Sequence, residues 1–172
     1  AGLYIGFGSK IKFFNFENKT IIDVYTTLGC IKDICLIENN IFFIDDLENE
    51  SRILYTSDFI NFNNLLDYNT LENKFTKYGR EGTFNWHFKE IVGNNFNNIY
   101  LSFSSSVNEF EATVDGIMKF NGSEFEWIFD SMYKTRFRTE LNGWSYGCHG
   151  PFYGIYASSH NDNVCLVANI ET

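Results

Sequence analysis

The most unusual chemistry of this chain lies between Gly143 and Gly150, where glycines separate a tryptophan, a tyrosine and a histidine. Aromatic rings with hydrogen-bonding neighbours suit the recognition of sugars or peptides. The small glycines leave room beside these rings. We therefore expect Trp144, Tyr146 and His149 to line a concave ligand-binding surface. The alternative is that the glycines allow close packing of a strand and that Trp144 is buried in the core.

Nucleophilic catalysis finds little support in the sequence. The chain contains three histidines, His87, His149 and His160, and it lacks the G-x-S-x-G motif of a serine hydrolase. Cys148 and His149 are adjacent, so on a strand their side chains point to opposite faces and cannot form a dyad directly.

Carboxylates are concentrated in the segment from Asp45 to Glu50, which contains Asp45, Asp46, Glu48 and Glu50. Calcium prefers such oxygen ligands, but the spacing is not that of a calcium-binding loop. We therefore expect the tip of a hairpin in solvent, with no bound metal. No other motif indicates a cofactor.

Four cysteines, Cys30, Cys35, Cys148 and Cys165, permit two disulfides without establishing them. One close pair and one distant pair do not match the two close pairs of a zinc ribbon or finger. Buried free thiols and at least one disulfide both remain open.

These residues are carried by short runs that alternate with period two, which predicts β-strands. The pair Asn121-Gly122 separates two such runs and predicts a hairpin turn. The polar segment from Tyr68 to Asn85 lacks this alternation, and we expect it to be a long loop between two units.

The strands recur as a repeat. Ile31–Ile34 (IKDI) matches Phe88–Ile91 (FKEI), and an Asn-Asn pair with an apolar run follows each. The other matches pair Arg52–Tyr55 with Gly116–Lys119, Asn64–Asp67 with Trp127–Asp130, and Leu3–Ile5 with Ile41–Phe43. The predicted units are 1–28, 29–68, 84–132 and 135–172.

Repeats of roughly 40 to 60 residues with four strands each are typical of β-propeller blades. Asp115–Gly122 resembles the third-strand hairpin of propeller repeats. Tyr55–Phe62 resembles a degenerate Asp-box hairpin of sialidase-type propellers, without the turn glycine and the closing tryptophan. The resemblance implies an all-β fold of four-stranded antiparallel repeats. A β-sandwich is the structural alternative.

The same resemblance implies a place for catalysis, because propeller-type glycosidases use paired carboxylates near the central axis. Asp33 and Glu90 would occupy equivalent places on inner strands and would then be the catalytic pair. Each acid follows a lysine, Lys32 or Lys89, so repeated solvated charges explain the pairing equally well.

The composition of the chain limits the classes of partner that it can bind. The chain has 172 residues and a formal net charge of −9, without a cluster of basic residues, which argues against a nucleic-acid partner. No apolar stretch approaches the roughly 20 residues that span a membrane.

We therefore predict a binding or structural module that recognises a glycan or a protein, in an extracellular location or on a cell or virus surface. The alternative is a propeller-type hydrolase. The first unit lacks an inner strand and the last an outer strand, because Val164–Ala168 matches the third strand. We expect further chain or another polypeptide to complete the fold.

Overall fold

The computed structural model describes residues 1–66, 84–107, 112–130, 152–157 and 164–168, and its regular elements there are all antiparallel β-strands. The strands are β1 (Gly2–Phe7), β2 (Lys10–Asn15), β3 (Thr20–Thr26), β4 (Cys30–Ile37), β5 (Asn40–Asp46), β6 (Ser51–Thr56), β7 (Asn63–Asn64), β8 (Phe84–Asn95), β9 (Asn98–Val107), β10 (Ala112–Phe120), β11 (Phe125–Asp130), β12 (Phe152–Ala157) and β13 (Val164–Ala168). Within these ranges no helix has the length and apolarity to cross a membrane.

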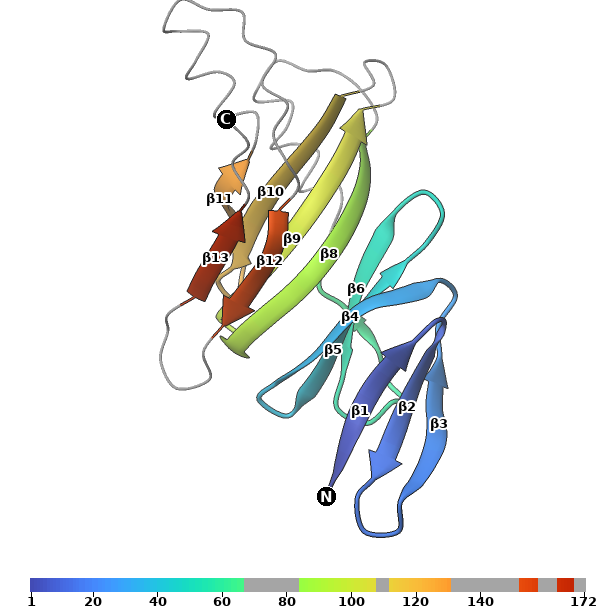
Figure 1. The fold of residues 1–172 in the computed structure, drawn as a ribbon. Coiled ribbons are helices and arrows are strands. Elements are labelled where there is room, and N and C mark those ends of the chain that lie inside the picture. The colour runs from blue at the N-terminus through green and yellow to red at the C-terminus, as the bar shows by residue number, and fades with distance from the viewer. Residues whose placement is uncertain (67–83, 108–111, 131–151, 158–163, 169–172) are drawn as a thin grey trace, which may run out of the picture.

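The strands form four sheets, each in simple sequential order (Figure 1). We call them sheet A (β1-β2-β3), sheet B (β4-β5-β6-β7), sheet C (β8-β9-β10-β11) and sheet D (β12-β13). The predicted all-β class with antiparallel sheets is confirmed. Strand β8 begins at Phe84, inside the segment that the sequence suggested as a loop.

The first strands of sheets B, C and D share a β-bulge at the same place. In β4 the register shifts between Ile31 and Asp33, in β8 between Phe88 and Glu90, and in β12 between Phe152 and Gly154. A bulge inserts one residue that has no partner on the neighbouring strand. Lys32, Lys89 and Tyr153 are these inserted residues.

Later strands confirm the repeat. On the third strand, Arg52 of sheet B and Gly116 of sheet C pair with equivalent residues of the second strand. The same is true of Leu54 and Met118. On the fourth strand, Asn64 pairs with Leu54 as Trp127 pairs with Met118. These are the matches that the sequence predicted.

Sheet A carries the second, third and fourth strands of the repeat. Its β2–β3 ladder has a register shift between Ile11 and Lys12, and the β10–β11 ladder has one between Ile117 and Met118. The equivalent isoleucines of the three third strands, Ile11, Ile53 and Ile117, are 0%, 0% and 2% exposed. The sequence therefore repeats its core position as well as its strand pattern.

The shared bulge gives the last unit a different alignment from the one we predicted. The position of the bulge aligns β12 with β4 and β8, and β13 with β5 and β9, whereas the sequence suggested that Val164–Ala168 matches the third strand. The runs before Pro151 in that unit lie outside the described residues. The repeated segment IKDI or FKEI is replaced by FYGI at Phe152–Ile155. This segment has neither the lysine nor the acid by which the first strands of the other units were recognised.

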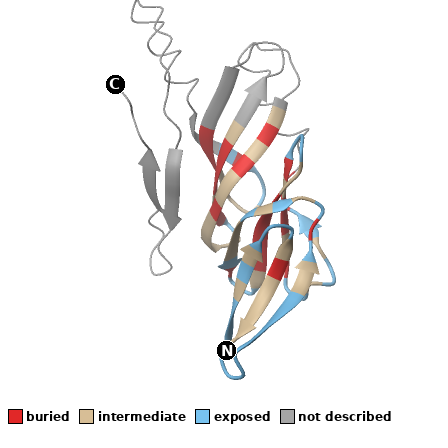
Figure 2. Cartoon of the chain, turned by 45° about the vertical axis from the view of Figure 1, so that its right-hand side comes forward, coloured by how far each residue is buried: buried red, intermediate tan, exposed pale blue. Residues whose placement is uncertain are grey.

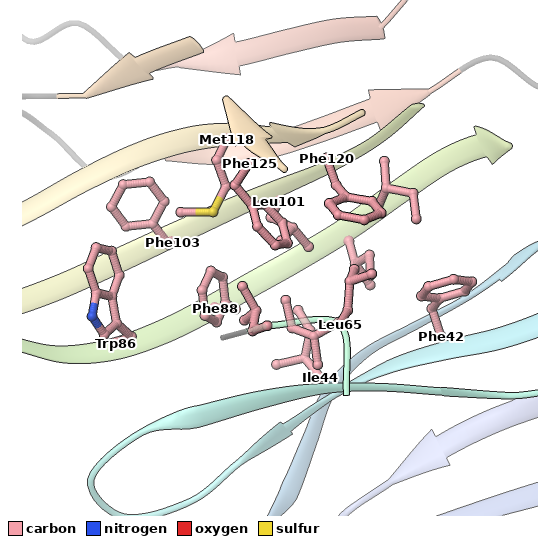
Figure 3. Packing of buried hydrophobic residues seen from close by; sticks show 14 of the residues in the cluster. Phe42, Ile44, Leu65, Trp86, Phe88, Leu101, Phe103, Met118, Phe120 and Phe125 are labelled. Carbon is pink, nitrogen blue, oxygen red and sulfur yellow. The ribbon is translucent and has the colours of Figure 1, made fainter. Parts of the chain in front are cut away.

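The sheets pack face to face in the order of the chain. The larger core lies between sheets B and C, where Phe42 and Ile44 meet side chains that include Phe88, Leu101 and Met118 (Figure 3). Ile53 belongs to the same core. The smaller core lies between sheets A and B around Ile11, Phe43 and Leu54. Sheet B thus presents one face to sheet A and the other to sheet C. Strand β12 of sheet D lies next to β8.

One face of sheet A is open. Exposed residues predominate in β1 and β3, as their colour in Figure 2 shows. Leu3, Ile5 and Phe7 on this face are 52%, 37% and 73% exposed, whereas the equivalent residues of sheet B, Ile41, Phe43 and Asp45, are 5%, 0% and 0% exposed. In sheet C the equivalents Ile99, Leu101 and Phe103 are all 0% exposed. The same face is therefore covered in sheets B and C and uncovered in sheet A.

Candidate functional site

Asp33 joins the first strands of two neighbouring sheets. It follows the bulge of β4, and its Oδ2 accepts a hydrogen bond of 2.9 Å from the backbone N–H of Ile91 on β8. Its Oδ1 accepts one of 2.8 Å from the N–H of Ile34. Burial raises the pKa of Asp33 above its ordinary value, although both N–H groups act in the opposite direction. The carboxylate is thus half-buried, with both oxygens bonded to main chain.

Glu90 occupies the corresponding place on β8. It follows the bulge residue Lys89 and pairs with Ser102, as Asp33 follows Lys32 and pairs with Ile44. Both acids lie on the first strand of a four-stranded sheet, as predicted, and the first strands β4 and β8 lie against each other. The structure therefore places the two predicted acids equivalently.

A second polar link between sheets B and C centres on Asp46, the last residue of β5. Its Oδ1 lies 2.9 Å from Nδ1 of His87, and its Oδ2 lies 3.1 Å from Nζ of Lys32. Ser51 also donates to Asp46, and its Oγ accepts the N–H of Phe88 at 3.0 Å. Burial by itself would raise the pKa of Asp46, but the hydrogen bonds from His87, Ser51 and Lys32 outweigh it and lower this pKa.

A buried ion pair lies beside this network and was missed by the sequence analysis. Asp45 is 0% exposed, is paired with Arg52, and accepts the N–H of Gly29 at 2.8 Å. The two residues are partners across the β5–β6 ladder. A signal was available: Ile44-Asp45 and Arg52-Ile53 flank a short loop, so opposite charges had to face each other across the hairpin.

The acidic segment is therefore not the solvated tip that we expected. Asp45 and Asp46 end a strand and are buried or half-buried, and of its acids only Glu48 and Glu50 are exposed. Within the described residues no group of His, Cys, Asp and Glu has the arrangement of a metal site.

Cys30 and Cys35 are free thiols. Cys30 is exposed, whereas Cys35 is half-buried on β4. Burial raises the pKa of Cys35 to about 12, and the charge of Asp33 adds to this effect. Cys35 therefore stays protonated and unreactive at neutral pH. Cys148 and the side chain of Cys165 lie outside the described part of the chain.

The predicted ligand-binding residues Trp144, Tyr146 and His149 lie outside the described residues. Of the predicted site, the structure thus describes the two carboxylates. Chemically, that part can hold neighbouring sheets together through a carboxylate and main-chain N–H groups. An acid with a raised pKa could also serve as a proton donor.

Comparison with protein-family models, with curated proteins and with solved structures gives no match.

Proposed function

We propose that this chain is a binding module of the β-propeller type, in which stacked four-stranded sheets form a scaffold. The register supports this proposal. Sheets B, C and D share the first-strand bulge, and β4, β8 and β12 follow one another side by side. Successive first strands in contact are what a propeller places around its axis.

The observation that favours binding over catalysis is the state of Asp33. Both of its oxygens accept main-chain N–H groups, one of which belongs to the neighbouring sheet. A general acid or base must reach the reacting atoms, whereas a carboxylate with these bonds is held between two strands. Asp33 therefore serves the scaffold in this proposal.

We place the ligand at Trp144, Tyr146 and His149, and we propose a glycan or protein as the partner. The location would be extracellular or on a cell or virus surface. Aromatic rings spaced by glycines give flat apolar platforms for sugar rings.

The alternative is a propeller-type hydrolase that uses Asp33 and Glu90. One observation favours it: burial raises the pKa of Asp33, which is the direction that a general acid requires. The two proposals differ in the residues on which glycan binding and glycan turnover should depend.

A glycan panel separates them when binding and turnover are both measured. Under the binding proposal, Trp144→Ala weakens binding by about tenfold, as for the loss of one aromatic anchor, while Asp33→Asn leaves it unchanged. Phe16→Ala is the matched control, since it removes an aromatic side chain that is 53% exposed in sheet A. Turnover that disappears in both Asp33→Asn and Glu90→Gln would support the hydrolase. An unchanged affinity of Trp144→Ala would contradict the proposed site.

A further inference from the structure

Strand β1 leaves one edge of sheet A without a strand among the described residues. Register makes β1 equivalent to β5, β9 and β13, the second strands of the other sheets. In each of those sheets a bulged first strand pairs antiparallel with the second strand on this edge. An uncovered edge carries unpaired N–H and C=O groups and is a template for an added strand.

Sheet B does not cover the open edge of β1, because it packs on the face of sheet A in the same position that sheet C takes on sheet B. Strand β4 contacts β1, and to a lesser extent β2, as β8 contacts β5 and β6. The contact is close: a Cβ on Gly6 would lie 2.6 Å from Cγ2 of Ile31. Sheet B therefore sits on sheet A as sheet C sits on sheet B, and only the counterpart of β4 is lacking among the described residues.

A hydrogen-bond donor also lies where the added strand would need one. Ile91 and Ile34 are equivalent residues of β8 and β4. The N–H of Ile91 donates to the acid of the preceding first strand, Asp33. The N–H of Ile34 has no such strand before it among the described residues and donates to the side chain of its own neighbour, Asp33. A carboxylate on an added strand could replace that local bond.

We propose that the open edge of β1 binds an extended segment with the pattern of the repeat's own first strand. The segment runs antiparallel to β1, with an apolar residue opposite Phe7, one bulged residue, an acid opposite Gly6 and an isoleucine opposite Ile5. This is recognition by strand addition, in which main-chain hydrogen bonds give affinity and alternate side chains give specificity. It rests on register and does not depend on a ligand at Trp144.

The test uses the whole chain and a fluorescein-labelled peptide of residues 29–38, with Cys30→Ser and Cys35→Ser to prevent oxidation. Fluorescence anisotropy should show saturable binding. Asp33→Asn in the peptide should weaken binding about fivefold, because a charged acceptor is replaced by a neutral one. Ile34→Pro in the peptide should abolish binding, since proline disrupts strand pairing. Both control changes lie in the peptide, so neither affects folding of the protein.

Amide hydrogen exchange locates the peptide. We expect those N–H groups of Gly2–Phe7 that point away from β2, toward the open edge, to become protected when the peptide binds. Three results would overturn the proposal: no binding at millimolar peptide, protection only elsewhere, or edge amides of β1 that are already as protected in the free chain as those of β5. The last result would mean that the chain covers this edge itself.

Discussion

Asp45 and Arg52 show why single polar residues matter in this molecule. Asp45 is 0% exposed, and its partners are Arg52 and the N–H of Gly29. The Nε of Arg52 is buried without a hydrogen-bond partner among the described residues. Taking a charge out of water is costly unless its partners remain, so removal of one partner leaves the cost of the other uncompensated.

We expect Arg52→Met to lower the free energy of unfolding by about 3 kcal/mol, because it leaves Asp45 buried without its countercharge. Lys12→Met is the matched control. It removes a lysine that lies 2.8 Å from Asp23, at a carboxylate whose side chain is 41% exposed. Urea unfolding of both variants measures the difference, and equal effects would contradict the expected cost of burial.

Asp33 should make stability depend on pH with a definite sign. In the folded chain the pKa of Asp33 is raised above its ordinary value of 3.8, so the folded state binds this proton more tightly than the unfolded state does. This contribution is fully present below pH 3.8 and is lost as pH rises through the raised pKa.

The variant Asp33→Asn removes this titration. The free energy of unfolding of the wild type, minus that of the variant, should therefore increase as pH falls through this window. Chemical denaturation at several pH values measures it. A difference that is constant, or that decreases toward low pH, would contradict a raised pKa of Asp33 in the folded chain.

At the scale of strands, much of the fold could be predicted from the sequence. Period-two alternation identifies the strands, and the repeated segments identify which residues occupy equivalent positions in different sheets. The matches of Arg52 with Gly116 and of Asn64 with Trp127 are the matches of the ladders. Alternation in the sequence does not reveal where a strand ends, so Asp45 was assigned to a hairpin tip, whereas the ladder extends to Asp46. The lysine and acid at the bulges of β4 and β8 are absent from Phe152–Ile155 (FYGI), so the sequence did not reveal the bulge of β12.

The site was less predictable than the fold. Sequence placed Asp33 and Glu90 on equivalent strands, but the acceptor role of Asp33 depends on Ile91, which is 58 residues away. Such a contact follows from how two sheets pack, and no local pattern encodes it. The link between Asp46 and His87 is hidden for the same reason.

The equivalent isoleucines of the third strands allow a graded test of the repeat. Ile53→Ala should cost about 3 kcal/mol, within the usual range for a buried isoleucine. Ile11→Ala should cost less, because Ile11 belongs to the smaller core. Ile60→Ala, at a side chain 79% exposed, should cost less than about 0.5 kcal/mol. Thermal or urea unfolding gives the order, and a larger effect at Ile60 than at Ile53 would contradict the assigned core.

For the whole molecule, the unequal cores predict unequal local stability. Among the residues that the structure describes, the core between sheets B and C contains fifteen buried residues, whereas the one between sheets A and B contains three. Regions with few buried apolar contacts open at lower free energy than the molecule as a whole.

Native-state hydrogen exchange should therefore find β2 less protected than β5 and β9. The central strand of each sheet is the fair comparison, because its N–H groups lie between two neighbouring strands. Equal protection in all three strands would indicate that the described residues open as one cooperative unit.

Sheets A, B and C are stacked face to face, and the open face of sheet A makes the two ends of this stack different. Sheet B offers one face to sheet A and the opposite face to sheet C. A sheet that stacked in the same way on the exposed face around Leu3, Ile5 and Phe7 would therefore use its opposite face. A contact that extends this stacking is therefore heterologous and joins head to tail, in contrast to the self-complementary contact of a two-fold dimer. The rotation between sheets alone then decides whether such growth ends in a ring or continues as a filament.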